Sequence, residues 1–457
     1  MYEVDATILR AYDVRGIYGK NLTAETGYLL GKAFAVDLLA QGGACVCVGH
    51  DVRLSSPELE NAVVAGLSES GLRVLRIGTG PSPMLYFAQK HLGADAGIMI
   101  TGSHNPAEYN GIKFCLKSGP FFGEDIQRLG EIARAGAFVE KPGVIENVSV
   151  IEEYVARLMQ DYTGHYSQSR ALKIVWDPAN GAACNVLEYL LPLLPGEHMV
   201  LNGMGDGNFP AHHPDPCVES NMVQLARAVQ DTGADLGIGF DGDADRIGVV
   251  DGEGRLIMGD QLLAFYAQEL AKTHAGKPVL IDVKSGQSVL DRLQDLGLRG
   301  ELTRTGHSYI KKRMQELNCP LAGEMSGHMF FADRYYGFDD GIYAAIRLIG
   351  ALGLESYSLS EWLGAFPPTY ITPESWHDCA DTVKFGVIET IRKKLIEQQA
   401  DFIDVDGVRV STPDGWWLIR ASNTQAVIVS RAEGKTTEGL KRLLKDVNDH
   451  LNQAGVF

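Results

Sequence analysis

The hexapeptide TGSHNP, residues 101–106, places a serine where it could act as a nucleophile or carry a phosphoryl group. The hexapeptide lies between two short apolar runs, so it begins where a buried strand is expected to end. Gly102 allows a sharp backbone turn, and Pro106 restricts the residue before it to an extended conformation. We therefore expect Ser103 on a stiff loop, with His104 beside it to supply positive charge or to move a proton. An ordinary Gly/Asn/Pro turn is the alternative.

A second polar stretch, DGDADR at residues 241–246, carries three alternating aspartates. In an extended loop Asp241, Asp243 and Asp245 converge on one face, where their charges repel unless a cation compensates them. An all-oxygen ligand set of this kind suits Mg²⁺. The stretch lacks the Gly and Glu positions of an EF-hand. Three ligands leave coordination positions open, which an oxygen of Ser103 or of a phosphate could fill. A solvated acidic turn is the alternative.

Two later stretches offer groups that bind sugars and phosphates. In GEMSGH, Glu324 and Ser326 alternate after an apolar run, and a carboxylate plus a hydroxyl can read neighbouring sugar hydroxyls. In RASNTQ, polar groups between two expected strands could surround a phosphate, although a plain hairpin turn explains them equally well. These groups are Arg420, Ser422, Asn423 and Thr424. Further cations end or follow apolar runs at Arg15, Lys113, Lys284 and His307.

The composition limits the classes of partner. The chain has 457 residues, 45% of them hydrophobic, and 41 basic against 58 acidic residues give a net charge of −17. We therefore expect a multidomain globular protein that binds neither nucleic acid nor membrane. The stretch MYEVDATILRAYDVRG has no signal-peptide pattern, and the seven cysteines show no paired spacing for disulfides or zinc. Both features predict a reducing, cytoplasmic environment.

The elements that must position these groups follow a β-then-α rhythm, which predicts α/β layers with largely parallel sheets. Several expected strands end in a polar turn that carries an aspartate, as repeated α/β units aimed at one cleft would. Strands are expected at 45–49, 74–77, 96–101, 173–177, 235–240, 247–251, 279–283 and 321–323. Helices are expected at 23–40, 57–70, 151–162, 221–232, 261–271 and 341–352.

The rhythm changes after residues 366–368, where the sequence reads Phe-Pro-Pro. A helix near 384–397, strands at 407–410, 416–420 and 426–431 and a final helix predict a small α+β domain with helices on an antiparallel sheet. We place domain boundaries near residues 150, 253 and 366. The predicted domains are thus 1–150, 151–253, 254–366 and 367–457.

The four motifs TGSHNP, DGDADR, GEMSGH and RASNTQ, in this order and spacing, closely resemble those of the α-D-phosphohexomutase superfamily. The resemblance covers essentially the whole chain and includes LRAYDVRG and DGNFPAHHPDP. It implies three related α/β domains with mixed sheets plus a C-terminal α+β domain around a central cleft. It further implies that Ser103 is a phosphoserine and that a phosphoserine oxygen completes a Mg²⁺ site on Asp241, Asp243 and Asp245.

The resemblance also assigns binding roles. Glu324 and Ser326 would bind sugar hydroxyls, and the RASNTQ residues would bind the phosphate that is not reacting. The remaining cleft positions would be Tyr12, Arg15, His104, Lys113, Arg246, Lys284, His307 and His328. Lys113, His104 and Lys284 are open candidates for the group that deprotonates the incoming hydroxyl.

The activity implied by the resemblance is the interconversion of hexose 1-phosphates and 6-phosphates, of mannose and/or glucose, through a hexose 1,6-bisphosphate. No obligate protein partner is indicated. The main competing hypothesis is a sibling mutase for glucosamine or N-acetylglucosamine phosphate, although Met325 favours the mannose/glucose branch by resemblance. Two further hypotheses are a metal-dependent phosphatase that uses Ser103 transiently and a non-catalytic sugar-phosphate sensor.

Overall fold

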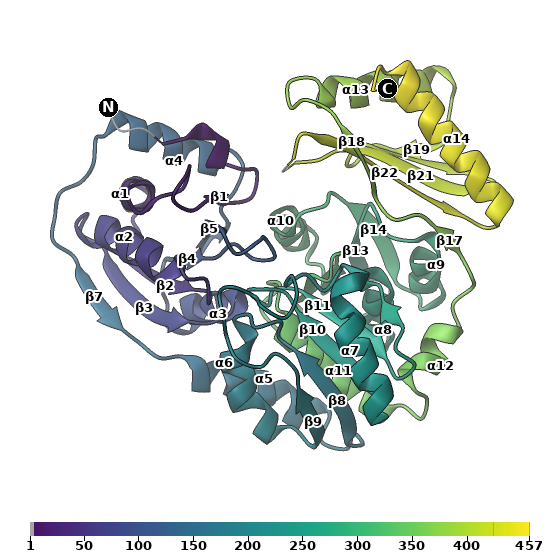
Figure 1. Cartoon of the computed structure of the whole chain (residues 1–457), viewed down its shortest axis with the longest axis horizontal. Helices are drawn as coiled ribbons and strands as arrows, with labels where there is room; N and C mark the ends of the chain where they lie inside the picture. The colour runs from purple at the N-terminus through teal and green to yellow at the C-terminus, as the bar shows by residue number, and fades with distance from the viewer. Residues whose placement is uncertain (1–3, 424, 457) are drawn as a thin grey trace.

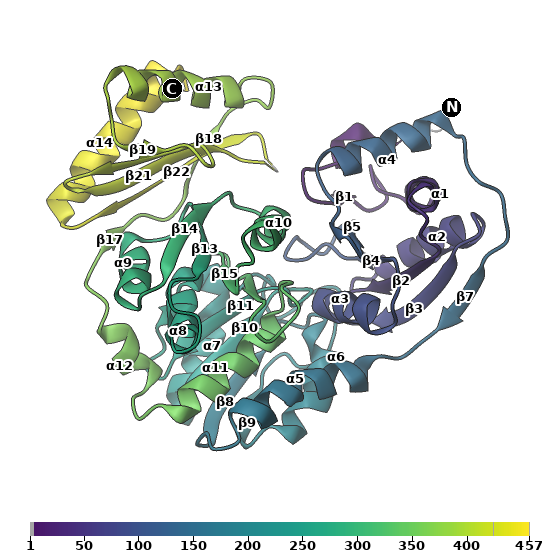
Figure 2. The ribbon, with the colours of Figure 1, turned by 180° about the vertical axis from the view of Figure 1, so that it is seen from behind.

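The computed structural model describes residues 4–423 and 425–456. It arranges four sheets with their helices along an arc, so that the N-terminal and C-terminal domains lie at its two ends (Figures 1 and 2). We call them domains I to IV in chain order. The four sheets and the mixture of parallel and antiparallel pairing agree with the fold expected from the resemblance, whereas the α/β rhythm alone predicted largely parallel sheets. No described helix is long and apolar enough to cross a membrane.

Domain I is built on a seven-stranded sheet of order β1-β5-β4-β2-β3-β7, with β6 paired to β5. Strands β4, β2 and β3 are mutually parallel, and β5 returns antiparallel to β4. Its strands are Val14–Ile17 (β1), Cys45–His50 (β2), Arg73–Thr79 (β3), Ala96–Ile100 (β4), Tyr109–Leu116 (β5), Gly119–Pro120 (β6) and Val144–Asn147 (β7). Its helices are Ala24–Ala40 (α1), Ser56–Ser68 (α2), Ser82–His91 (α3) and Glu124–Ala135 (α4).

Domain II repeats this arrangement in a five-stranded sheet of order β12-β11-β10-β8-β9. Its helices are Ile151–His165 (α5), Ala183–Leu190 (α6) and Glu219–Thr232 (α7). Its strands are Leu172–Asp177 (β8), Gly196–Val200 (β9), Leu236–Phe240 (β10), Ile247–Asp251 (β11) and Leu256–Ile257 (β12). The sheet takes in β12, which lies beyond residue 253, and the boundaries between the domains remain a prediction.

Domain III has a four-stranded sheet of order β14-β13-β15-β16. Its strands are Pro278–Asp282 (β13), Arg299–Thr303 (β14), Leu321–Gly323 (β15) and Met329–Phe331 (β16). Its helices are Gly259–Ala271 (α8), Gln287–Asp295 (α9), His307–Leu317 (α10), Gly341–Leu354 (α11) and Leu359–Gly364 (α12). Domains I, II and III therefore share one unit, three parallel strands plus one antiparallel strand: β5-β4-β2-β3, β11-β10-β8-β9 and β16-β15-β13-β14.

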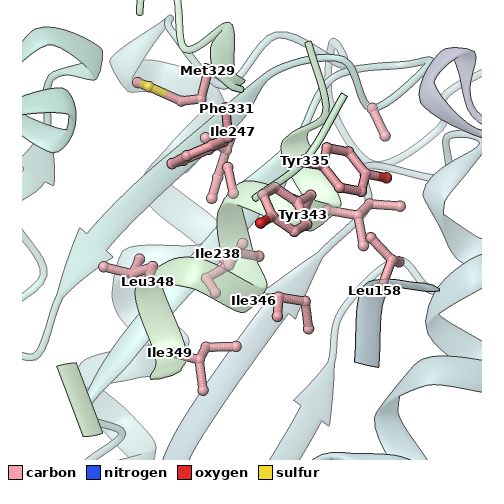
Figure 3. Close-up of a cluster of buried hydrophobic side chains, with 14 of the residues drawn as sticks. Leu158, Ile238, Ile247, Met329, Phe331, Tyr335, Tyr343, Ile346, Leu348 and Ile349 are labelled. Carbon is pink, nitrogen blue, oxygen red and sulfur yellow. The ribbon is translucent and has the colours of Figure 1, made fainter. Parts of the chain in front are cut away.

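The largest hydrophobic cluster belongs to domains I, II and III together. It joins side chains of α3 and β3 to those of α5, β8 and β10 and to those of α8, β13 and α11. Figure 3 shows part of this cluster, where Leu158 of α5 and Ile238 of β10 lie around Tyr343 and Ile346 of α11. Helix α11 is apolar on most of its surface, and it is therefore buried on most sides, as a core helix is. The three domains thus share one cluster, although domain I also has a large hydrophobic cluster of its own and domains II and III each have a small one.

Domain IV has a six-stranded sheet of order β17-β22-β21-β20-β19, with β18 paired to β22. Its strands are Tyr370–Ile371 (β17), Ser375–Asp378 (β18), Phe402–Ile403 (β19), Val408–Thr412 (β20), Gly415–Ala421 (β21) and Val427–Gly434 (β22), and its helices are Lys384–Glu397 (α13) and Thr437–Gln453 (α14). In α14 the buried residues Leu443, Val447 and Leu451 recur every four positions, so one face of the helix packs on the sheet. The core of domain IV is separate, and a small cluster of Val283, Trp416 and Leu418 joins it to domain III.

Candidate active site

The serine loop, residues 101–108, is the turn of the β4–β5 hairpin. Ser103 is buried and has a left-handed backbone with φ of +49°, which is uncommon for a residue other than glycine. Its N–H donates to Thr101 Oγ1 at 2.8 Å. Its hydroxyl donates to Asp241 Oδ2 at 2.9 Å, and His104 Nδ1 lies 3.3 Å from the hydroxyl oxygen of Ser103. The structure therefore brings the predicted carrier directly against the predicted metal loop.

The aspartate loop, residues 241–246, is the turn of the equivalent hairpin, β10–β11, in domain II. Asp241, Asp243 and Asp245 are fully buried, and one carboxylate oxygen of each lies within 4.8 Å of the others. Asp243 Oδ1 is buried without a hydrogen-bond partner among the described residues. A buried carboxylate oxygen without a partner is costly, and a hard divalent cation is a ligand that would satisfy it. The residues present fit a Mg²⁺ site.

Lys113 of β5 supplies part of the charge that this loop needs. Its Nζ donates to Asp243 Oδ2 at 2.7 Å and to Asp245 Oδ2 at 2.6 Å. Burial disfavours the charged ammonium, but the two carboxylates outweigh it and hold the pKa of Lys113 above its usual value. Burial, together with Asp245 and Asp243, raises the pKa of Asp241 well above its usual value. One ammonium therefore does not compensate three carboxylates, which is a second reason to expect a cation here.

His104 belongs to the serine loop and Arg246 ends the aspartate loop. Burial, then the charges of Arg246 and Arg15, hold the pKa of His104 well below its usual value, so its imidazole is neutral near pH 7. The backbone N–H of Arg246 donates to Asp241 Oδ1 at 3.1 Å, and its guanidinium lies 3.9 Å from Asp215. Arg15 donates to Asn105 Oδ1 of the serine loop. Two predicted cations thus contact the loops that the motifs identified.

The third equivalent hairpin, β15–β16, carries Glu324, Ser326 and His328 in its turn. Glu324 is buried, and its oxygens accept from Gly306 N–H at 2.6 Å and lie 2.9 Å from His328 Nδ1. Ser326 Oγ is half-buried and lies 3.2 Å from the same imidazole nitrogen. His328 Nε2 lies 3.1 Å from Asp245 Oδ1. His328 therefore links the predicted sugar loop to the metal loop.

The charges of this third loop follow from that link. Burial alone would lower the pKa of His328, but Asp245 and Glu324 raise it to about 10, so the imidazole is protonated at neutral pH. Burial alone would raise the pKa of Glu324, but the bond with His328 lowers it to about 2. Glu324 is thus a carboxylate whose oxygens are already partly engaged, and Ser326 is the more open of the two predicted sugar ligands.

The remaining predicted residues lie where domain IV meets domains I and III. The Tyr12 hydroxyl donates to Thr305 O at 3.0 Å and accepts from Asn423 Nδ2 at 2.8 Å, so one phenol joins three domains. His307 begins α10, and its ring is in edge contact with that of Tyr12. Arg420 is buried on β21 and donates from Nε to Asp406 Oδ2 at 2.9 Å.

The other two residues of this region have local partners. Lys284 Nζ lies 3.5 Å from Glu374 Oε1 and 4.0 Å from Asp282 Oδ2. Ser422 Oγ accepts from the N–H of Gln425 at 3.2 Å. Thr424 lies outside the described residues. The predicted residues thus form one group around Ser103 and a second group around Arg420, and the contacts of Tyr12 connect domain I to the second group.

Several polar residues of the site were not identified from the sequence. Ser82 donates to Asp243 Oδ2 at 2.5 Å, and Asp339 accepts from Lys311 at 2.9 Å and lies 3.3 Å from His307. Beneath the serine loop lie Asp51 and Arg53, both fully buried. The stretch GHDVR showed an aspartate after a strand, but nothing in that pattern indicated which loop it supports. A hollow of about 780 Å³ on domain II, between α6 and β9, is lined by none of the predicted residues.

Comparison with known families matches the chain along nearly its full length. Four profiles match in order: "Phosphoglucomutase/phosphomannomutase, alpha/beta/alpha domain I" at residues 6–140, "domain II" at 152–254, "domain III" at 258–370 and the "C-terminal domain" at 386–450. Their order is that of the four sheets described above, and each match covers most of one sheet.

Individual relatives agree. The chain is 41% identical to "Phosphomannomutase/phosphoglucomutase" of Pseudomonas syringae pv. tomato over 437 residues, which cover 96% of this chain and 93% of the relative. It is 39% identical to "Phosphoglucomutase" of Neisseria gonorrhoeae over 448 residues, which cover 97% and 96%. A crystal structure of a phosphoglucomutase/phosphomannomutase family protein from Burkholderia thailandensis superimposes with a TM-score of 0.93 at 36% identity, covering 100% of this chain and 99% of that one. On these matches, and on four domains in the same order, the chain belongs to the phosphoglucomutase/phosphomannomutase family.

Proposed function

We propose that this protein is an isomerase that interconverts the 1-phosphates and 6-phosphates of mannose and glucose, with Ser103 as the phosphoryl carrier. The observation that carries the proposal is the approach of Ser103 Oγ to within 2.9 Å of Asp241, inside a cluster of three buried carboxylates. The names of the relatives at about 40% identity support the same activity.

The carrier step balances as a simple exchange. The bond between phosphorus and Ser103 Oγ breaks, a bond between phosphorus and a sugar hydroxyl oxygen forms, and the hydroxyl proton passes to a base on the protein. The product is a hexose 1,6-bisphosphate. After it turns, the same exchange runs in reverse with its other phosphate, so the serine is phosphorylated again and no net phosphate is consumed. Mg²⁺ held by Asp241, Asp243 and Asp245 would offset negative charge on the transferring group.

Of the three candidate bases, His104 fits best. A general base must be unprotonated at working pH and close to the proton that it takes. His104 is neutral near pH 7 and lies 3.3 Å from Ser103 Oγ. Lys113 instead donates to two carboxylates that raise its pKa. Lys284 contacts Glu374 at the border with domain IV. We therefore assign the base to His104 and the charge compensation to Lys113.

Binding at the far end would leave the sugar free to turn. Arg420, Ser422 and Asn423, with Thr424, would hold the phosphate that is not reacting, because a guanidinium with hydroxyl and amide donors matches a phosphate. Ser326 and Glu324 would contact the sugar hydroxyls between the two phosphates. A site that makes no contact specific to carbon 2 accepts both glucose and mannose, which differ there.

The decisive experiment replaces the carrier. Ser103→Ala should abolish the protein population that intact mass finds heavier by one phosphate, and should lower turnover of glucose 1-phosphate and mannose 1-phosphate by at least about 10⁴-fold. Ser68→Ala is the matched control, because that hydroxyl lies in the same domain and bonds only within its own helix, to Ala65 O. Full turnover by Ser103→Ala would overturn the proposal.

The substrate class has its own test. One relative, from Methanothermobacter thermautotrophicus, is named "Probable phosphoglucosamine mutase" at 36% identity, so the aminosugar phosphates are assayed alongside. We expect higher kcat/KM on glucose and mannose 1-phosphates than on glucosamine and N-acetylglucosamine 1-phosphates. The reverse order would favour an aminosugar mutase, and steady release of inorganic phosphate would favour a phosphatase.

A further inference from the structure

A single buried guanidinium holds the backbone of the serine loop from below. Arg53 is only 1% exposed. Its Nη2 donates to the carbonyls of Ser103 at 2.7 Å and Asn105 at 2.6 Å. Its Nη1 donates to the carbonyls of Pro106 at 2.5 Å and Tyr109 at 3.0 Å. Three carbonyls of the serine loop and that of Tyr109, the first residue of β5, therefore accept from one side chain that follows another strand.

Asp51 fixes this guanidinium and the start of the loop together. Its Oδ2 accepts from Arg53 Nε at 3.1 Å, from Thr101 Oγ1 at 2.8 Å and from Gly102 N–H at 3.3 Å. Thr101 Oγ1 in turn accepts from the N–H of Ser103. One buried carboxylate thus orients both the residues that precede Ser103 and the arginine that binds the carbonyls after it. Because Asp51 and Arg53 form an ion pair, they add little net charge to the site, and their effect on the serine loop is to fix its conformation.

The fit around Arg53 leaves little freedom. A Cβ added to Gly102 would lie 2.5 Å from Arg53 Cζ, and a Cβ added to Gly242 would lie 2.4 Å from the carbonyl oxygen of Ser103. Phe209 of domain II lies with its ring 5.0 Å from the guanidinium. The serine loop is therefore confined between Arg53 on one side and the aspartate loop on the other.

The repeated unit provides an internal comparison. Asp51-Val52-Arg53 follows β2, and Asp282-Val283-Lys284 follows β13, the equivalent strand of domain III. Lys284 contacts Asp282 and Glu374 instead of the carbonyls of the β15–β16 turn. The extensive backbone contact of Arg53 is thus a property of the domain that carries the reacting serine, and the shared fold does not require it.

We propose that Arg53, oriented by Asp51, is a positioning residue for phosphoryl transfer. It holds Ser103 in its left-handed conformation, so that Oγ stays aimed at Asp241 whether or not it carries a phosphate. This rests on the proposed function of Ser103. A misplaced carrier slows transfer without weakening the binding of the distal phosphate, because the bonds of Arg53 among the described residues all go to domain I. The loss should therefore fall on kcat.

The test compares Arg53→Ala and Arg53→Lys with Arg76→Ala, whose guanidinium in the same domain bonds to Glu60 and Asn61, away from the serine loop. For Arg53→Ala we expect kcat on glucose 1-phosphate to fall about 10²-fold, with KM within about 3-fold of wild type. Arg53→Lys should recover only part of this, because an ammonium cannot reach four carbonyls. Non-denaturing guanidinium should raise kcat of Arg53→Ala at least about tenfold and leave Arg76→Ala unchanged.

A second readout isolates the transfer itself. Dephosphorylated protein is mixed with glucose 1,6-bisphosphate, and phosphate uptake is followed by intact mass. Uptake should be slowed in Arg53→Ala to the same degree as kcat. If Arg53→Ala does not fold, Asp51→Asn, which keeps the size of the side chain but removes its charge, should show a kcat loss of about tenfold.

The outcomes separate the two proposals. Arg53 variants with the kcat of Arg76→Ala, or a loss explained wholly by a smaller folded fraction and not restored by guanidinium, would overturn the positioning role while leaving the mutase activity intact. A wild-type protein without turnover, or an active Ser103→Ala, would instead reject the proposed function.

Discussion

The two regions that we propose to handle phosphate are built differently. The region around Ser103 and Asp241 lies between domains I and II, which share one hydrophobic cluster with domain III. Figure 3 shows side chains that domains II and III contribute to it. The region around Arg420 belongs to domain IV, whose core is separate. This domain meets domain III through the cluster of Val283, Trp416 and Leu418 and through polar contacts, among them the bonds from Arg409 to the carbonyls of Val283 and Ser285. On the proposed function, chemistry that depends on close alignment is placed on the shared core, and binding that must release and recapture a phosphate is placed on the separately cored domain.

Local contacts follow the same division. Ser103, Asp241, Asp243 and Asp245 are buried and bonded to one another, to Lys113 or to His328. In the RASNTQ stretch Ser422 is buried, Asn423 is half-buried and Gln425 is exposed. Tyr370 of the segment that leads into domain IV is 44% exposed. Domain IV is joined to its neighbours by one small apolar cluster and by polar contacts such as those of Arg409 with the carbonyls of Val283 and Ser285. Polar contacts of this kind can be exchanged when a domain closes over a ligand.

The largest effect is expected when a carboxylate of the aspartate loop is removed. Asp243→Asn should lower turnover about 10³-fold and weaken Mg²⁺ binding measured by calorimetry, because the carboxylate with the unpartnered oxygen is the one removed. A chelator should abolish wild-type activity and Mg²⁺ should restore it. Asp231→Asn, on the exposed surface of the same domain, is the control. Turnover that persists in chelator would show that the aspartate loop does not act through a metal.

An intermediate effect is expected at the distal region. Arg420→Ala should raise KM for glucose 1-phosphate about 10- to 100-fold while kcat falls much less, because a charge-assisted contact made throughout the reaction is lost. Arg442→Ala, which breaks an exposed ion pair with Asp414 in the same domain, should change neither constant. A loss of activity that fell mainly on kcat would place Arg420 with the reacting groups and contradict the proposed separation of the two regions.

The smallest expected effect concerns stability. Folding raises the pKa of His328 from 6.5 to about 10, so its stabilising charge is fully present below pH 6.5 and is lost as the pH rises toward 10. In chelator, the free energy of unfolding should therefore fall between pH 6.5 and 9, by on the order of 1–3 kcal/mol more in wild type than in His328→Gln. Urea titrations measure this. His450→Gln in domain IV should follow wild type, and a parallel decline in His328→Gln would remove His328 as the cause.

Much of the fold was predictable because strand ends and helix periods are local signals. The strands at 247–251 and 321–323 and the helix at 384–397 lie where the sequence placed them. The chemistry of the motifs was equally local: a turn serine, alternating aspartates and a Ser-Asn-Thr turn each stand out from a few residues. Their roles in this chain remain predictions, although the structure brings Ser103, Lys113, His328 and the three aspartates together.

What could not be predicted depends on pairing between distant segments. Arg53 and Ser82 follow or begin ordinary elements, and only the fold shows that one reaches the carbonyls of residues 103–109 and the other reaches Asp243. The same holds for Lys113. Its residue type indicates a positive charge, but nothing in the local sequence indicates its two carboxylate partners. Asp406 likewise carries no local signal of its bond to Arg420. Such partners are chosen by topology, over separations of 14 to 161 residues.

The hydrophobic cluster shared by domains I to III also limits how this chain can be recombined. Their sheets share one topology, as copies of an ancestral unit would. Each domain nevertheless packs part of its apolar surface against its neighbours, so none of the three can be exchanged by itself. Domain IV has its own hydrophobic core and touches the other domains through one small apolar cluster and a set of polar contacts. Chimaeras between relatives should therefore tolerate a crossover at the entrance to domain IV far better than one anywhere upstream.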